Sequence, residues 1–159
     1  MLNNSLVLGI DLGTSGVRIA IINTKKKILF TSSKTYSKGL EISEDWVNSL
    51  KTLLKEIPKV LKEKLVACSV AGTSGTLLAC QDNGKPLGKA LPYFLSCNEH
   101  SNEINNLFKK ECAGSSISGS VGRALRLLTL YGHEIILRHQ ADWFSGWLIN
   151  NWELSIIHI

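Results

Sequence analysis

The segment Asp11–Arg18, with the sequence DLGTSGVR, carries residue types that can hold a phosphate and a metal ion. Glycines let the backbone approach a bulky anion, and successive amides together with the hydroxyls of Thr14 and Ser15 can face phosphate oxygens. The Asp11 carboxylate would repel a phosphate unless a cation lay between them, and Mg²⁺ commonly binds both carboxylates and nucleotide phosphates. The segment therefore predicts parts of a site for phosphoryl transfer, with Asp11 as the metal ligand.

The same residues would also suit a plain hairpin turn, in which Asp and Gly serve only the turn. The functional interpretation rests on the whole pattern. Asp11 ends an apolar run, Gly-Thr follows two residues later, and Arg18 opens the next apolar run. The pattern GxxxxGK[ST] of the Walker loop does not occur in the chain, so another kind of phosphate site is expected.

The elements that must position this segment can be read from the apolar pattern. Short apolar runs at 6–10, 17–22 and 28–31, joined by tight polar connections, predict an antiparallel meander. A helix with Ser43 as its N-cap should follow and end near Pro58. The further elements expected in this half are a short helix at 59–64, a strand at 65–70, a small-residue turn at 71–76 and a strand at 77–80.

The second half of the chain shows helical spacing more often than strand spacing. Residues 98–110 predict a helix with Ile104, Leu107 and Phe108 on one face. A helix at 124–131 should be closed by Gly132, followed by a strand at 134–137 and a helix from an Asp142 N-cap to Ile149. Strands first, then strands alternating with helices, predict one α/β domain with a mixed sheet and no linker.

Composition excludes several classes of protein. The chain is 44% hydrophobic and 19% charged, which is typical of a globular protein, and it lacks an apolar run long enough for a membrane span or a secretory signal. The net charge is +5, but the basic residues are scattered, and the run Lys25–Lys27 fits a hairpin turn better than a nucleic-acid site. The four cysteines show no metal-binding spacing. We expect a cytoplasmic protein with no nucleic-acid or membrane partner.

The segment Leu8–Arg18 resembles the first phosphate motif of the FGGY carbohydrate kinases, which include xylulokinases, ribulokinases and glycerol kinases. The resemblance continues in Val70–Thr76 and in His139–Trp147, and it extends to about Trp152. The order and spacing match the N-terminal lobe of that family and look most like its xylulokinase and D-ribulose kinase branch. The resemblance implies an actin-like, ribonuclease H-like fold.

The resemblance also implies roles for individual residues. Asp11 would be catalytic, holding Mg²⁺ and approaching the reacting sugar hydroxyl. The residues near the ATP phosphates would be Gly13, Thr14, Ser15 and Arg18. Thr73 and Ser74 would join Asp11 in contacting the sugar, which is expected to be a ketopentose such as ribulose or xylulose.

Two stretches depart from the family pattern, and the role of a third position stays open. Many relatives carry a Trp-x-Asp-x-Arg segment whose polar side chains help to bind sugar, whereas Leu91–Asn98 has neither Asp nor Arg. Ala71 stands where some close relatives have a carboxylate. Asp142 matches a recurring family segment, and both a helix cap and a substrate role remain open for it.

The resemblance predicts that residues 1–152 form the N-terminal lobe and that 153–159 are an atypical tail. The C-terminal lobe, with the general-base aspartate and the adenosine pocket, would then be absent, and a separate lobe or self-association could take its place. We expect weak ligand binding and no useful turnover by this chain alone. The alternative is a non-catalytic remnant that binds sugar or a partner chain. A chaperone or filament ATPase of the same fold is less consistent with Val70–Thr76 and with the segment Gln140–Trp143.

Overall fold

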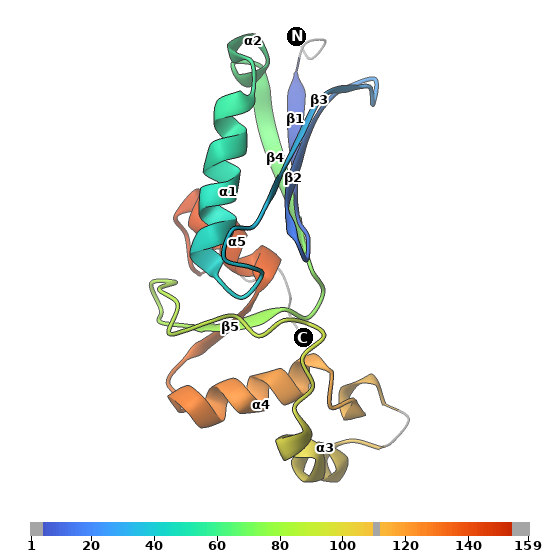
Figure 1. The fold of residues 1–159 in the computed structure, drawn as a ribbon, viewed down its shortest axis with the longest axis vertical. Coiled ribbons are helices and arrows are strands. Elements are labelled where there is room, and N and C mark those ends of the chain that lie inside the picture. The colour runs from blue at the N-terminus through green and yellow to red at the C-terminus, as the bar shows by residue number, and fades with distance from the viewer. Residues whose placement is uncertain (1–4, 110–111, 154–159) are drawn as a thin grey trace. The chain divides into compact units, whose positions relative to one another are not determined.

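The computed structural model of the chain describes residues 5–109 and 112–153 (Figure 1). Its contacts divide the chain into two compact units, Met1–Gly72 and Thr73–Ile159. The sequence pattern had suggested one domain without a linker. The assignment of residues 1–152 to one lobe stays a prediction, because two compact units can belong to the same lobe. Most of the expected tail lies outside the described residues.

The first unit is built on a four-stranded mixed sheet in the order β3-β2-β1-β4. β1 (Leu6–Leu12), β2 (Gly16–Asn23) and β3 (Ile28–Thr35) form the predicted antiparallel meander. β4 (Leu65–Gly72) then pairs in parallel with β1 on its other side. β1 is therefore a central strand, and the residues near its end are held from both sides.

One face of this sheet forms the core of the first unit. Burial alternates along β1, because successive side chains of a strand point to opposite faces. α1 (Ser43–Glu56) packs against β2 and β3 and covers the apolar face, as the ribbon shows (Figure 1). The predicted apolar stripe of the helix is confirmed by its buried members Trp46, Val47, Leu50 and Leu53. The opposite face of the sheet carries small and polar side chains around Asp11, and the apolar pair Val7 and Ile22 further along the strands.

The entry to α1 differs from the prediction that Ser43 is its N-cap. Ile42 occupies that position, and no side chain caps the helix. Instead Asp45, which is buried in the first turn, accepts hydrogen bonds from Ser37 Oγ (2.9 Å) and from the amides of Lys38 (2.5 Å) and Gly39 (3.2 Å). Burial alone would raise the pKa of Asp45, but these hydrogen bonds outweigh it and the pKa is lowered. The helix ends before Pro58, as predicted, and α2 (Lys59–Lys62) follows.

The second unit contains a two-stranded antiparallel sheet and several helices. β5 (Leu77–Cys80) pairs with β6 (Ile136–His139), which starts two residues later than the predicted strand. α4 (Ser120–Tyr131) ends where it was predicted to, because Gly132 adopts a left-handed φ of 83° and its amide donates to the Leu128 carbonyl. Leu77, Ala79 and Leu127 form the buried cluster that joins β5 to α4.

Two expectations for the second unit were wrong. The single helix predicted at 98–110 is instead a 3₁₀ turn, η1 (Asn98–His100), followed by a short helix, α3 (Ser101–Leu107). Of its predicted apolar face, Ile104 is fully buried but Leu107 is 66% exposed. Residue 110 lies outside the described residues. A further 3₁₀ turn, η2 (Ala113–Ser115), precedes α4. His139, not Asp142, is the N-cap of α5 (Gln140–Ile149), and Asp142 is buried within its first turn.

The basic run forms the turn that the sequence predicts. Lys25–Lys27 lie in an exposed turn, where the Asn23 side chain accepts from the amides of Lys25 and Lys27 and Lys26 adopts a φ of 61°. All four cysteines are free. Within 5–109 and 112–153, no helix combines the length and apolar character that crossing a bilayer requires.

Candidate functional site

Asp11 and Arg18 face each other across the two central strands of the first unit. They are direct partners in the β1–β2 ladder, and Arg18 Nη1 lies 3.4 Å from Asp11 Oδ2. Their side chains are 50% and 72% exposed, so both are accessible to a ligand. The strand continues to Leu12, which corrects the expectation that it ends on Asp11. Because Leu12 points into the core, Asp11 points to the open face of the sheet.

The open face around this pair is hollowed to a volume of about 840 Å³. Small residues line much of it, including Gly9 and Ala20 on the meander strands and Ser69 and Ala71 on β4. Their small side chains leave room above the sheet, and the volume is in the range of a small-molecule site. Among the described residues that line it, Asp11 is the only acidic one and Arg18 the only basic one.

The fit of a metal ion to this hollow depends on that single carboxylate. No group of three or more His, Cys, Asp or Glu side chains comes together in the part of the chain that the structure describes. A metal held entirely by protein ligands therefore has no candidate site there. Mg²⁺ fits better than other common metals, since it keeps several waters and uses one or two carboxylates together with substrate phosphates.

The connection between β1 and β2 shows that its two glycines serve different purposes. The amide of Gly13 donates to the Gly16 carbonyl (2.9 Å), and Thr14 and Ser15 are exposed at the tip. A Cβ on Gly16 would lie 2.3 Å from the Lys34 carbonyl of β3, whereas one on Gly13 would lie at an ordinary 3.4 Å from the Gly16 carbonyl. Gly16 is therefore required for strand packing, and only Gly13 remains a candidate for close approach of an anion.

In the second unit, the turn Thr73–Thr76 is held from inside the protein. Gln140 Oε1 accepts from the Thr73 amide (2.9 Å) and from the Thr73 hydroxyl (2.7 Å), which also lies 2.6 Å from Thr76 Oγ1. The next side chain, Ser74, is exposed, and Gly75 has a φ of 88°. Thr73 thus holds the turn through its hydrogen bonds to Gln140, while the side chain of Ser74 is exposed to solvent.

Sequence reasoning missed two buried side chains that fix this turn, Arg123 and Gln140. Arg123 is 2% exposed, and its Nε donates to the Gly75 carbonyl at 2.8 Å. Gln140 is fully buried, and its contacts to Thr73 join residues 67 positions apart. A signal for Arg123 was present, because it lies one helical turn before the core residue Leu127 and so belongs to the buried stripe of α4. Gln140 gave no comparable signal.

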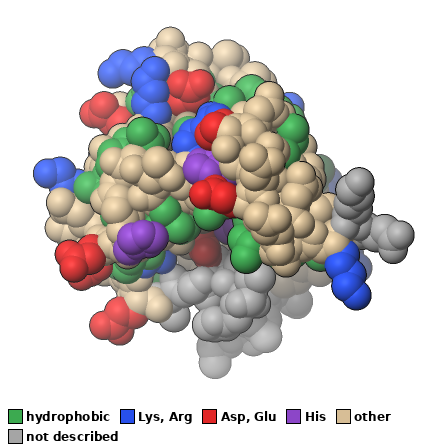
Figure 2. All heavy atoms as spheres, turned by 90° about the horizontal axis from the view of Figure 1, so that it is seen from below, with side chains coloured by type: hydrophobic (Ala, Val, Ile, Leu, Met, Phe, Trp, Pro, Cys, Tyr) green, Lys and Arg blue, Asp and Glu red, His purple; other side chains and the backbone are tan. Residues whose placement is uncertain are grey.

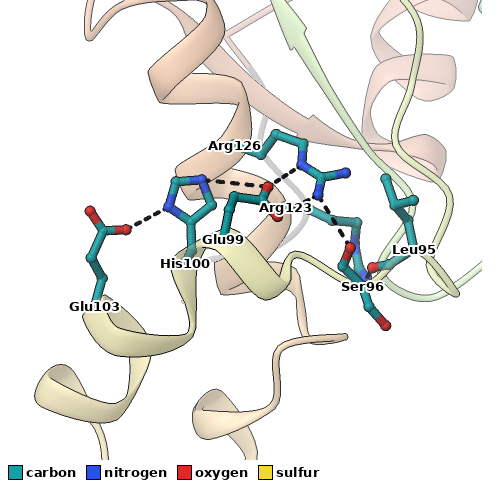
Figure 3. A network of polar contacts seen from close by, with 7 residues as sticks. All are labelled: Leu95, Ser96, Glu99, His100, Glu103, Arg123 and Arg126. Carbon is teal, nitrogen blue, oxygen red and sulfur yellow. Dashed lines mark hydrogen bonds and ion pairs between the residues drawn. The ribbon is translucent and has the colours of Figure 1, made fainter.

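A second set of polar side chains lies on the surface of the second unit. Acidic, basic and histidine side chains gather there on one face (Figure 2). In the close view, Arg126 donates to both carboxylate oxygens of Glu99, and His100 Nδ1 lies 2.5 Å from a Glu103 oxygen (Figure 3). The hydrogen bond from Arg126 lowers the pKa of Glu99 to about 2. This network joins η1 to α4, and its carboxylates are occupied by partners from the protein.

The predicted site residues therefore fall into two groups. One group surrounds the β1–β2 connection in the first unit and consists of Asp11, Gly13, Thr14, Ser15 and Arg18. The other consists of Thr73 and Ser74, which begin the second unit. Each group has exposed side chains, Thr14 and Ser15 in the first and Ser74 in the second.

No family model matches the chain. Solved structures do match it over most of its length. The glycerol kinase of Plasmodium falciparum, solved with ADP, gives a TM-score of 0.73 at 18% identity, and the match covers 92% of this chain and 35% of that one. The xylulose kinase of Bifidobacterium adolescentis gives 0.72 at 13% identity, covering 98% and 36%. The gluconate kinase of Lactobacillus acidophilus gives 0.67 at 12% identity, covering 89% and 32%.

These neighbours are sugar kinases, and at such identities the likeness shows the fold. The chain has the α/β fold of an actin-like, ribonuclease H-like lobe, as the sequence predicted. It spans about a third of the length of the kinases that it matches.

Proposed function

We propose that this chain provides the phosphate- and sugar-facing part of an ATP-dependent carbohydrate kinase of the FGGY type. The observation that carries the proposal is the placement of Asp11 on a central strand. It faces a hollow beside Arg18 and adjoins an exposed Gly-Thr-Ser connection. The fold shared with sugar kinases supports the same assignment.

Asp11 and Arg18 at the hollow, together with the β1–β2 connection that follows Asp11 in sequence, would act on the nucleotide by position and charge. Asp11 would hold Mg²⁺, which neutralises phosphate charge when it is bound. The hydroxyls of Thr14 and Ser15 and the backbone at Gly13 would donate to or approach phosphate oxygens. Arg18, opposite Asp11, would add a positive charge near the phosphates on the same face. Asp11 would also approach the reacting sugar hydroxyl.

The sugar would be contacted by the exposed hydroxyl of Ser74, with the partly buried Thr73 beside it. We propose a ketopentose such as ribulose or xylulose, because the motif segments resemble the xylulokinase and D-ribulose kinase branch and xylulose kinases occur among the structural neighbours. We also propose a cytoplasmic protein, which is consistent with its free cysteines. Since no second carboxylate lines the hollow in the part of the chain that the structure describes, we expect little turnover by this chain alone.

Calorimetric titration with ribulose, xylulose, glycerol and gluconate tests the proposed substrate class. We expect the two ketopentoses to bind most tightly, at roughly millimolar dissociation constants, and Ser74→Ala to weaken them about fivefold, since one hydrogen bond is worth ~1 kcal/mol. Ser116→Ala, which removes another exposed hydroxyl of the same unit, should leave the affinity unchanged. Equal affinities in Ser74→Ala and the wild type, or preference for gluconate, would contradict the assignment. Robust sugar phosphorylation by the chain alone would contradict the expected low turnover.

A further inference from the structure

Arg123 is a charged side chain in an unusual setting. It is 2% exposed, and burial lowers the pKa of its guanidinium. No carboxylate among the described residues forms an ion pair with it; backbone carbonyls receive its hydrogen bonds instead. A buried charge is costly unless its hydrogen bonds are satisfied. An apolar residue at this position of the stripe would avoid that cost, so stability alone gives a weak reason for an arginine here.

The carbonyls that Arg123 reaches come from separate loops of the second unit. Its Nε donates to Gly75 at 2.8 Å, and its Nη1 lies within hydrogen-bond distance of the carbonyls of Tyr93 (2.8 Å), Leu95 (3.1 Å) and Ser118 (2.7 Å). A planar guanidinium offers these donors in fixed directions, which a lysine ammonium cannot do. The side chain therefore sets the positions of several loop carbonyls relative to α4.

The turn at Gly75 is shaped to receive this guanidinium. A Cβ on Gly75 would lie 2.8 Å from Arg123 Nη2, and the φ of 88° also favours glycine. From the other side, the Tyr93 amide donates to Thr76 Oγ1 (3.3 Å), and Gln140 holds Thr73. The turn and the segment at Tyr93 are thus joined to each other as well as to Arg123.

We propose that Arg123 is a positioning residue that holds the Thr73–Thr76 turn and the Tyr93–Leu95 segment in one arrangement, so that the Ser74 hydroxyl is presented to a sugar. The inference rests on the proposed function, because that function assigns Ser74 to the sugar. Arg123 itself is buried behind the turn and acts through it.

Arg126, one turn further along α4, provides a matched control. Arg123 and Arg126 both extend from α4 toward the segment Leu95–Ser96 (Figure 3). Arg126 is partly exposed and pairs with Glu99, whereas Arg123 is buried and binds carbonyls. Replacing each arginine with lysine removes the forked geometry and leaves a single basic nitrogen as donor.

The first measurement is amide hydrogen exchange in the full chain, which needs no ligand. Arg123→Lys should speed exchange of the hydrogen-bonded amides of Thr73 and Tyr93 about tenfold, with no change in β1 and β2, because only the local opening becomes easier. Arg126→Lys should leave both amides unchanged. Wild-type rates at Thr73 and Tyr93 in Arg123→Lys would overturn the proposal. If that variant does not fold, exchange in the wild type tests the proposal instead. A common opening rate for the amides of Thr73 and Tyr93 supports it, and separate rates refute it.

The second measurement separates positioning from general destabilisation and from failure of the proposed function. Arg123→Lys should weaken ribulose or xylulose binding about fivefold or more and leave Mg-ADP binding unchanged, while Arg126→Lys changes neither. An equal loss of both affinities would indicate a merely structural residue. If the wild type binds no sugar, the sugar assignment of Ser74 fails, whereas the exchange result still shows whether Arg123 holds the turn.

Discussion

Replacing Trp46 with alanine is expected to destabilise the first unit by ~3–5 kcal/mol, the usual cost of removing a large aromatic side chain from a core. Trp46 is fully buried on the inner face of α1, and its Nε1 donates to the Leu40 carbonyl at 2.8 Å. The variant therefore leaves a cavity and an unpaired buried carbonyl. Because α1 covers the sheet that carries Asp11, loss of this contact should also remove ligand binding.

Urea unfolding followed by circular dichroism at 222 nm measures this effect without relying on tryptophan fluorescence. Thr52→Ala serves as the control, since Thr52 is exposed on the same helix and its hydroxyl only donates to the Asn48 carbonyl. It should change stability by no more than about 0.5 kcal/mol. A Trp46→Ala variant as stable as Thr52→Ala would show that α1 does not pack on the sheet as described.

The glycines of the β1–β2 connection should respond in opposite ways to alanine. Gly16→Ala places a Cβ 2.3 Å from the Lys34 carbonyl, so β3 must move away, at a cost of ~1–3 kcal/mol. Gly13→Ala meets only an ordinary contact and should change stability by less than about 0.5 kcal/mol. If Gly13 is the place where a phosphate approaches the backbone, however, its new methyl group should weaken nucleotide binding about fivefold or more.

Denaturant titration and nucleotide binding, applied to both variants, check this separation. The stability loss should appear in Gly16→Ala alone, and a loss of affinity at full stability should appear in Gly13→Ala alone. The assignment of Gly13 to the phosphate would be wrong if Gly13→Ala bound the nucleotide as the wild type does. Equal stability of the two variants would contradict the strand packing at Gly16.

Much of the first unit could be predicted because its signals are local. The alternation of apolar residues in β1 and β2 and the stripe of α1 each reflect a face that is buried within a short stretch of sequence. The cap of α1 was mispredicted for a specific reason. Ser43 has the right residue type for a cap, but the hydrogen bonds at this helix start come to Asp45 from residues 37–39.

The second unit was harder to predict because its contacts are long-range. The strand β6 is defined by pairing with β5, nearly 60 residues earlier, so its bounds could not be read from its own pattern. Leu107 fitted an apolar stripe, yet α3 ends there and leaves it exposed. The contacts of Arg123 and Gln140 likewise depend on loops that only the folded chain brings together.

The candidate site was likewise predictable where its signals are local and unpredictable where they depend on long-range contacts. The motif around Asp11 predicted the carboxylate, the loop and Arg18 as site residues from types and spacing. The structure places Asp11 beside Arg18, and the roles of all these residues stay a prediction. The sequence could not show that Gly16 is needed for strand packing while Gly13 is free to approach a phosphate. The difference arises because the backbone of β3 lies close to Gly16. Nor could it show that Thr73 faces inward to Gln140 while Ser74 faces solvent.

Binding of ADP with and without Mg²⁺ tests most directly whether Asp11 marks a metal–nucleotide site. Titration calorimetry on the wild type should show ADP binding that weakens about tenfold or more when Mg²⁺ is left out, and by a similar factor in Asp11→Asn with Mg²⁺ present. Asp82→Asn, at an exposed turn of the other unit, should bind as the wild type does. ADP binding that is indifferent to both Mg²⁺ and Asp11, or no binding at millimolar Mg-ADP, would contradict the assignment.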